Sequence, residues 1–291
     1  MPYSRLHQPL LDWYAAEARD LPWRAPDVSA WGVLVSEVML QQTPVSRVLP
    51  SYGDWLTRWP TPKDLAASPP GEAVRRWGTL GYPRRALRLH AAAVVITKSY
   101  GGTVPRDVED LRRLPGVGVY TAAAVASFAF RQRHAVVDTN VARVLARAVE
   151  GADRARAQPG TAERRRAADL LPDEAAAAAR WGVAVMELGA LVCVAREPRC
   201  HQCPIAQHCR WRAAGCPTSG PLPRRAQSYA GTDRQCRGRL LGVLRAIAAP
   251  VSARALAESW DVAAQRERAL ESLVTDGLVE PLADGRFGLP A

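Results

Sequence analysis

Four closely spaced cysteines constrain the fold of this 291-residue chain more than any other feature of its sequence. Cys193, Cys200, Cys203 and Cys209 follow the spacing Cys-x6-Cys-x2-Cys-x5-Cys, so one loop can bring four thiolates around one metal centre. Zinc usually takes two short Cys-x2–4-Cys pairs, whereas a single wide loop suits a 4Fe-4S iron–sulfur cluster better. We therefore expect a 4Fe-4S cluster, with tetrahedral zinc as the alternative. The cysteines at positions 216 and 236 do not fit this spacing and are expected to be plain thiols.

Helical periodicity dominates the rest of the sequence, and strand alternation is scarce. Apolar residues at helical spacing, bounded by Gly or Pro, predict helices over 9–19, 72–80, 84–100, 107–114, 120–130, 141–149 and 181–193. This pattern predicts an all-α fold. We expect residues 1–216 to form two helical subdomains, one of which carries the cysteine loop.

A stretch rich in Pro, Gly, Ser and Thr at 217–231 predicts a linker. After it, helices are expected over 237–248, 253–260 and 266–278, followed by a hairpin formed by 279–282 and 286–289. Three helices and a hairpin resemble a winged helix. We therefore expect residues 232–291 to be a short C-terminal module of that kind.

The formal net charge of +11 indicates an anionic partner, most often nucleic acid. Only Lys63 and Lys98 are lysines among the 39 basic residues, so compositional bias toward arginine is the alternative explanation. The charge is unevenly distributed. From Asp233 to Ala291 there are eight arginines and eight acidic residues, so this part is formally neutral and the surplus lies before it.

No apolar run reaches the roughly 20 residues that a membrane span needs. The first ten residues also lack the basic and apolar segments of a secretory signal. These features predict a cytoplasmic protein that has no membrane partner and is nucleoid-associated if it binds DNA.

The segment Leu114-Pro115-Gly116-Val117-Gly118 lies between two predicted helices. Gly116 and Gly118 allow a tight turn and a close approach of another molecule. The free N–H groups at the start of the following helix would form an anion site suited to a DNA phosphate. An ordinary turn between two helices is the alternative.

Two acidic residues stand out by their surroundings. Glu37 lies within the apolar stretch 33–40, and burial would raise its pKa so that it could donate a proton near neutral pH. The alternative is an exposed glutamate on an amphipathic helix. Asp138 follows an apolar run and precedes a helix, so it is also a candidate N-cap. One protonated and one ionised acid are what cleavage of a glycosidic bond through an oxocarbenium-like state requires.

Together these motifs resemble those of the MutY-type adenine DNA glycosylases, a family of the helix-hairpin-helix superfamily that includes endonuclease III. The resemblance covers about residues 9–225. It rests on LPWR at 21–24, WGVLVSEVMLQQT at 31–43, LGYPRRA at 80–86, LPGVGVYTAAAV at 114–125, VVDTNVARV at 136–144 and the four-cysteine loop.

The resemblance implies a fold and a reaction. It implies excision of adenine mispaired with 8-oxoguanine or guanine in double-stranded DNA, by an enzyme that we expect to be a monomer. Glu37 would protonate N7 of the flipped adenine and later activate water, and Asp138 would stabilise the positive sugar. Tyr120 and Asn140 match positions that hydrogen-bond to these groups.

Further positions of the resemblance concern the DNA. Arg19, Arg24, Leu40 and Gln42 match positions that line the adenine pocket or the adjacent stack, and Tyr82 matches the residue that wedges into the duplex. Packing in the core is the alternative role for Leu40, Tyr82 and Tyr120. Position 120 is a tyrosine where bifunctional lyases of the superfamily carry the lysine that attacks the sugar. We therefore expect a monofunctional enzyme that leaves the abasic site uncut.

The sequence departs from the family pattern in two places. Position 83 is proline where the family often has a second tyrosine. The C-terminal module contains no histidine and does not resemble the Nudix-like domain with which relatives read 8-oxoguanine. The sequence therefore leaves open which base opposite the adenine the enzyme recognises. Removal of thymine or uracil opposite guanine, and non-catalytic recognition of damaged DNA, are the alternative functions.

Overall fold

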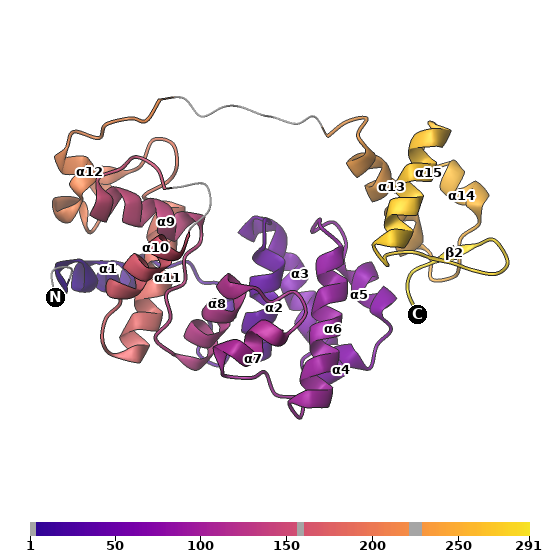
Figure 1. The fold of residues 1–291 in the computed structure, drawn as a ribbon, viewed down its shortest axis with the longest axis horizontal. Helices are drawn as coiled ribbons and strands as arrows, with labels where there is room; N and C mark the ends of the chain where they lie inside the picture. Colours follow the sequence, from indigo (N-terminus) through magenta and orange to yellow (C-terminus); the bar gives the residue numbers. More distant parts are fainter. Residues whose placement is uncertain (1–3, 156–159, 221–228) are drawn as a thin grey trace. The chain divides into compact units, whose positions relative to one another are not determined.

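The computed structural model describes residues 4–155, 160–220 and 229–291 (Figure 1). The chain divides into two compact units. The first holds Met1–Val33, Arg106–Arg112 and Val117–Leu222, and the second holds Leu34–Pro105, Arg113–Gly116 and Pro223–Ala291. Each unit therefore combines segments that are distant in sequence.

The described part of the first unit is helical. Its helices are α1 (Ser4–Glu17), α7 (Val108–Arg113, whose last residue falls in the second unit), α8 (Val119–Phe130), α9 (Thr139–Leu145), α10 (Thr161–Asp169), α11 (Ala175–Leu191) and α12 (Arg210–Ala213). Short 3-10 turns occupy Pro22–Arg24, Cys200–Gln202 and Ala206–His208, and a π turn, Ala146–Glu150, extends α9.

The core of the first unit forms around α11, which packs against α1, α8 and α9. Leu10 of α1 and Leu188 of α11 are fully buried in one apolar cluster with Val144 of α9. Alanine-rich sequence in α11 provides a smooth surface, so neighbouring helices approach it closely. This core fixes α9 and the loop that follows α11, which carry most of the predicted site residues of this unit.

The second unit begins within α2 (Ala30–Leu40), whose residues from Leu34 onward belong to it. It continues through α3 (Val45–Arg58), α4 (Pro62–Ala66), α5 (Pro70–Trp77) and α6 (Arg84–Ser99). The tryptophans Trp55, Trp59 and Trp77 are almost completely buried and meet edge to face, with ring centroids 4.6 and 5.5 Å apart. Such aromatic pairs contribute more than area burial alone.

The second unit also includes the C-terminal module, drawn in orange to yellow in Figure 1. It consists of α13 (Asp233–Ala246), α14 (Ala253–Ala257), α15 (Ala263–Thr275) and an antiparallel pair, β1 (Glu280–Pro281) and β2 (Phe287–Gly288). A single bridge joins Val251 to Phe287. The three predicted helices and the hairpin are therefore present.

The prediction of an all-α fold is confirmed, but the predicted helices do not include α2, α3, α4, α10 and α12. The other differences concern the ends of elements. The helix predicted over 72–80 is α5, which starts earlier at Pro70 and ends at Trp77 because Gly78 adopts a positive φ of 53°. Each strand of the hairpin has only two residues. Residues 221–228 of the predicted linker lie outside the described residues. None of the described helices has the length and apolar character to span a membrane.

Candidate active site and cysteine loop

The four cysteines of the predicted metal loop are half-buried and line one pocket. The loop follows α11, and two 3-10 turns place its last three cysteines. The pocket is completed by apolar and basic residues: Arg147, Val192, Pro198, Ala206, Trp211 and Arg212. Four thiols lining one pocket are a donor set that fits a thiolate-ligated cluster. Within the described ranges, no group of three His, Cys, Asp or Glu side chains is arranged to hold a metal ion.

Burial raises the pKa of three of these thiols, Cys200, Cys203 and Cys209, and brings that of Cys203 to about 12. Neighbouring thiols raise these pKa values further, because each negative thiolate disfavours the next. These three thiols are therefore protonated at neutral pH without a cation, and any metal centre that binds them must displace their protons.

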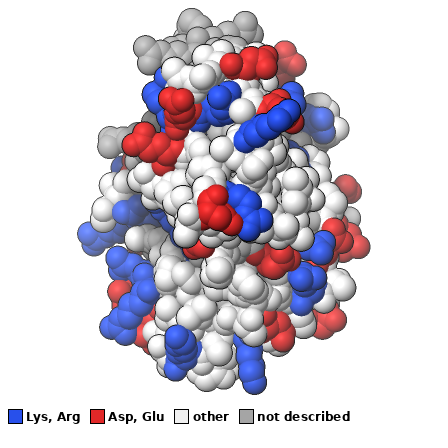
Figure 2. All heavy atoms as spheres, turned by 90° about the vertical axis from the view of Figure 1, so that its right-hand side faces the viewer, with Lys and Arg blue, Asp and Glu red and all other residues white. Residues whose placement is uncertain are grey.

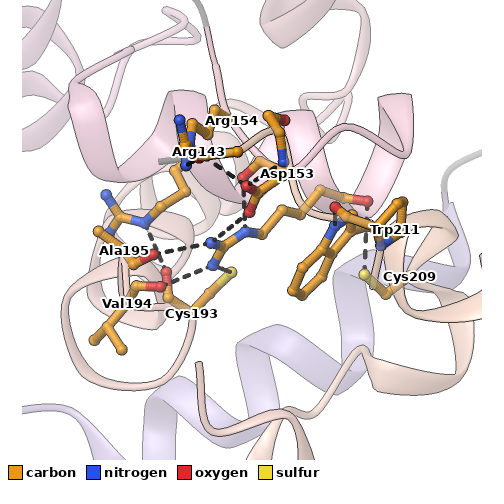
Figure 3. Close-up of polar contacts among 12 residues, drawn as sticks. Arg143, Asp153, Arg154, Cys193, Val194, Ala195, Cys209 and Trp211 are labelled. Carbon is orange, nitrogen blue, oxygen red and sulfur yellow. Dashed lines mark hydrogen bonds and ion pairs between the residues drawn. The ribbon is translucent and has the colours of Figure 1, made fainter. Parts of the chain in front are cut away.

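Arg147 anchors the cysteine loop from the π turn. Its side chain is 3% exposed and donates hydrogen bonds to the carbonyls of Val194 (2.8 Å) and Ala195 (3.2 Å). It also approaches Cys193 Sγ at 3.5 Å, lies over the Trp211 ring at 4.7 Å and forms an ion pair with Asp153 at 3.3 Å (Figure 3). The sequence analysis missed this role, although an arginine four residues after Arg143 on a helix could have indicated it.

Asp138 is the N-cap of α9, so the capping role is confirmed. Its carboxylate accepts hydrogen bonds from the backbone N–H of Val141 at 2.7 Å and from the side-chain amide of Asn140 at 2.9 Å. Burial raises the pKa of Asp138, while these two hydrogen bonds and the nearby Arg143 oppose the rise because they favour the charged form. Asp138 and Asn140, which the sequence placed together, are therefore in direct contact.

Arg143 joins this pair to the cysteine loop. Its guanidinium donates to Asn140 Oδ1 (2.7 Å), to the Gly189 carbonyl (2.7 Å) and to the Cys193 carbonyl (2.7 Å). A Cβ at Gly189 would lie 2.7 Å from the Asn140 Cβ, so only glycine permits this approach of α11 to α9. Hydrogen bonds thus run from Asp138 to the loop that carries the cysteines.

Arg19 and Arg24 converge on a residue that the sequence analysis missed, Glu187 of α11. Its fully buried carboxylate receives Arg19 Nε at 2.6 Å, Arg19 Nη2 at 2.7 Å and Arg24 Nη2 at 2.9 Å. Burial alone would raise the pKa of Glu187, but the hydrogen bonds from both arginines outweigh it and hold the pKa at about 2. Arg24 also lies 5.8 Å from the Tyr14 ring, and its Nη1 is buried with no acceptor among the described residues.

Glu37 lies on α2 and is 6% exposed, so the alternative of an exposed glutamate is wrong. Leu40, at the end of the same helix, is half-buried, and Gln42 is exposed with a positive φ of 56°. The backbone at the end of α2 is held by Arg85, which the sequence analysis also missed.

Arg85 of α6 is buried and ties the end of α2 to the loop before α6. It donates to the carbonyls of Val38, Met39 and Gln41 on one side and of Leu80 and Gly81 on the other, at 2.6–3.3 Å. Its guanidinium also lies 5.6 Å from the ring of Tyr82. Burial lowers the pKa of Arg85 to about 10 because the charge is desolvated.

Tyr82 is 51% exposed, so the alternative of a core tyrosine is wrong for this position. Its φ of 47° lies in the left-handed region, which is uncommon for a residue other than glycine. Tyr120, on α8, is half-buried. The structure thus places Tyr82 at the surface in a conformation that its surroundings must maintain.

The two glycines of the 114–118 segment have different conformations. Gly116 has a φ of 80°, and a Cβ there would meet the Arg88 Cβ at 2.8 Å, so the fold itself requires glycine. Gly118 is the N-cap of α8 with an ordinary φ of −92°, and nothing lies within 4 Å of the position of its Cβ. Gly116 therefore has the left-handed conformation of a tight turn, and the close approach of another molecule at Gly118 stays a prediction.

Comparisons with known proteins agree with the motifs. Residues 35–168 match the family described as HhH-GPD superfamily base excision DNA repair protein. Adenine DNA glycosylase of Mycolicibacterium smegmatis is 57% identical, with 96% of this chain and 94% of the relative covered. Adenine DNA glycosylase of Mycobacterium tuberculosis is 55% identical, with 97% and 92% covered.

A solved structure of a thermostable thymine-DNA glycosylase shares the fold, with a TM-score of 0.66 and 28% identity over 73% of this chain and 97% of that one. The sequence similarity to the mycobacterial enzymes is twice as high and extends through the C-terminal module. The chain therefore belongs to the adenine DNA glycosylase family, within the helix-hairpin-helix superfamily of base excision DNA repair proteins.

Proposed function

We propose that this chain is a monofunctional adenine DNA glycosylase that excises adenine mispaired with 8-oxoguanine or guanine. The observation that carries the proposal is its similarity to adenine glycosylases over nearly its whole length. The chain also provides two carboxylates with different surroundings, the buried Glu37 and the hydrogen-bonded Asp138. Cleavage of an N-glycosidic bond requires such a pair, one acid to protonate the base and one anion to stabilise the sugar.

In the proposed reaction, Glu37 donates its proton to N7 of an adenine that has left the base stack. The bond between C1′ and N9 then breaks, its electron pair stays on the base, and adenine leaves as a neutral molecule. Asp138 stabilises the positive charge that develops on the sugar. Glu37, now ionised, takes a proton from the water that attacks C1′, which restores the acid for the next turnover.

Asp138 must be ionised when the sugar becomes positive. The N–H of Val141 and the amide of Asn140 stabilise its anionic form, and partial burial strengthens its attraction to a neighbouring cation. Tyr120 is assigned a hydrogen-bonding role in the same constellation. Because position 120 is not a lysine, the enzyme is expected to have no strong lyase activity.

We assign recognition of the DNA to residues that have a hydrogen-bond donor or an open surface not used within the protein. Arg24 Nη1 lacks an acceptor among the described residues and could donate to the extruded purine, while Glu187 holds Arg24 and Arg19 in place. The open surface at Gly118 leaves room for a phosphate at the start of α8. Tyr82 is proposed to wedge into the duplex, and Leu40 and Gln42 to line the base pocket.

We further propose that Cys193, Cys200, Cys203 and Cys209 hold a 4Fe-4S cluster. When bound, the cluster would supply cationic iron that stabilises four thiolates and closes the loop. Arg147 and Arg143 would orient the loop backbone around it through the carbonyls of residues 193–195. The proposed excision needs no electron transfer.

Single-turnover excision on a panel of duplexes tests this function. Adenine opposite 8-oxoguanine, guanine and cytosine would be compared with thymine and uracil opposite guanine. We expect excision of adenine opposite 8-oxoguanine and guanine, and a loss of at least about 100-fold in Glu37→Gln, since general acid catalysis contributes 10²–10⁴-fold. Full excision by Glu37→Gln would contradict the assignment. Efficient trapping of a protein–DNA adduct by borohydride would contradict the monofunctional mechanism.

The second candidate is removal of thymine opposite guanine, which the structural similarity to a thymine-DNA glycosylase favours. The same panel decides between the two. Excision of thymine with adenine left intact would establish the second candidate. Specific binding without any excision would instead indicate a non-catalytic damage-recognition protein.

A further inference from the structure

The C-terminal module and α5 cap each other's ends with arginines. Arg75, in the last turn of α5, donates Nη1 to the carbonyls of Leu244 (3.1 Å), Arg245 (2.6 Å) and Ile247 (2.8 Å) at the end of α13. Arg245, in the last turn of α13, donates Nε to the Val74 carbonyl (2.9 Å) and Nη1 to the Gly78 carbonyl at the end of α5. The last carbonyls of a helix have no partner within it and favour cations, so this exchange satisfies both ends.

Two more contacts attach the module within the same unit. The Gly71 N–H donates to the Pro290 carbonyl at 2.8 Å, and a Cβ at Gly71 would lie 2.4 Å from that oxygen. Arg84, at the start of α6, forms an ion pair with Asp276 at 3.2 Å, and Arg237 holds Asp276 at 2.6 Å. The module therefore contacts both ends of α5 and the first turn of α6.

The charges of the module do not form a positive field. Figure 2 shows basic and acidic side chains interspersed on the face turned toward the viewer, and Asp233–Ala291 is formally neutral. On α15, Arg268 is paired with Asp233, and in the hairpin Arg286 is paired with Asp284. Non-specific DNA binding depends on unpaired positive charge. These features indicate that the module acts on the rest of its own unit.

Residues 78–83 join α5 to α6 and carry Tyr82, and we call them the Tyr82 loop. The contacts of the module flank this loop. Arg245 binds Gly78, the residue that follows α5, and Asp276 binds Arg84, two residues after Tyr82. Between these points Tyr82 is half-exposed and has a positive φ. Such a conformation is strained and persists only where surrounding contacts fix it. Arg85 fixes the loop from inside, and the module fixes its two ends.

We propose that the C-terminal module fixes Tyr82 in the conformation that inserts into DNA, with Arg245 as its main positioning residue. This inference rests on the proposed function, in which Tyr82 wedges into the duplex. A loop fixed in its bound conformation loses less entropy when it binds. The module therefore promotes opening of the mispair without contacting the lesion, which gives the neutral C-terminal part a role in the reaction.

Arg245→Ala in the whole chain tests this positioning role, with Arg239→Ala as the matched control. Arg239 is exposed on the same helix, so both variants lose one positive charge from α13. Base opening would be followed by the fluorescence of 2-aminopurine beside the mispair, and excision by single-turnover kinetics. For Arg245→Ala we expect the half-saturating enzyme concentration to rise roughly five- to tenfold. The fluorescence change should shrink, while the maximal rate and its pH profile stay close to wild type.

A double-mutant cycle with Tyr82→Ala separates this role from general stability. If Arg245 acts through Tyr82, Arg245→Ala adds little to the loss already caused by Tyr82→Ala. If the two losses multiply, or if Arg245→Ala lowers the melting temperature but binds and opens DNA like Arg239→Ala, the inference is wrong.

If Arg245→Ala does not fold, Arg245→Lys and Asp276→Asn take its place in the same cycle, and they decide between the same outcomes. Absence of adenine excision by wild type and by Arg239→Ala would instead refute the proposed function. The fluorescence cycle would still report whether Arg245 controls opening of the duplex by Tyr82.

Discussion

The cysteine loop and the Tyr82 loop are both held by buried arginines, but the charge of those arginines is balanced in different ways. Arg147, under the cysteine loop, combines backbone carbonyls with a carboxylate, Asp153, whose side chain is 10% exposed. At the Tyr82 loop, Arg85 donates to backbone carbonyls and to the Thr43 hydroxyl, Arg245 donates to backbone carbonyls, and burial lowers the pKa of both to about 10.

This difference shows two ways of stabilising a buried cation. An ion pair offsets the desolvation of the charge with another charge, provided that hydrogen bonds satisfy both groups. Carbonyls at helix ends offer only partial negative charge, so several of them must converge on one guanidinium. The second arrangement depends more on geometry and tolerates less change in the shape of the cation.

The largest effect is expected at the cysteine loop, because this loop, in contrast to the Tyr82 loop, depends on a metal centre. We expect Cys200→Ser to lose most of its bound iron and the brown colour of the cluster, and to destabilise the cysteine loop, because one of four ligands is removed. Iron analysis and absorbance spectroscopy measure this. Cys216→Ser, outside the ligand spacing, is the control and should keep its iron. Zinc in place of iron in the wild-type protein would refute the cluster.

A smaller effect is expected when the buried arginines that hold the two loops are replaced by lysine. Lysine keeps the charge but cannot serve several carbonyls in a fork geometry. We expect Arg85→Lys to lower the free energy of unfolding by about 3 kcal/mol, since it leaves buried carbonyls unpaired. Arg147→Lys should cost roughly 1–2 kcal/mol, because the pairing with Asp153 can persist. Denaturant unfolding gives both values. A larger loss of stability for Arg147→Lys than for Arg85→Lys would contradict the difference between the two loops.

A further effect, with a clear pH signature, is expected at Glu187, a carboxylate that balances two arginines. Its pKa is about 2 in the folded state, below the ordinary value of 4.5. The stability it provides is therefore complete above pH 4.5 and disappears as the pH falls toward 2. We expect Glu187→Gln to be less stable than wild type at neutral pH, with the difference shrinking through that window. A constant difference across the window in acid unfolding would contradict the ion pairs.

Most of the fold and part of the site could be predicted from the sequence. Helical periodicity, the N-cap at Asp138 and the cysteine spacing depend on residues within a few positions of one another. The burial of Glu37 could be inferred from its apolar neighbours. Family resemblance added the roles of Tyr82, Asn140 and the arginines at 19 and 24, of which the contact of Asn140 with Asp138 is observed directly.

The supporting residues were decided only by the tertiary structure. Glu187 lies 168 positions from Arg19, and Arg245 lies 171 positions from Val74, so no local pattern connects them. Secondary structure and capping follow from the conformational preferences of neighbouring residues, which a sequence displays openly. The partner of a buried charge follows from which helices pack together, and that is settled only when the whole core forms.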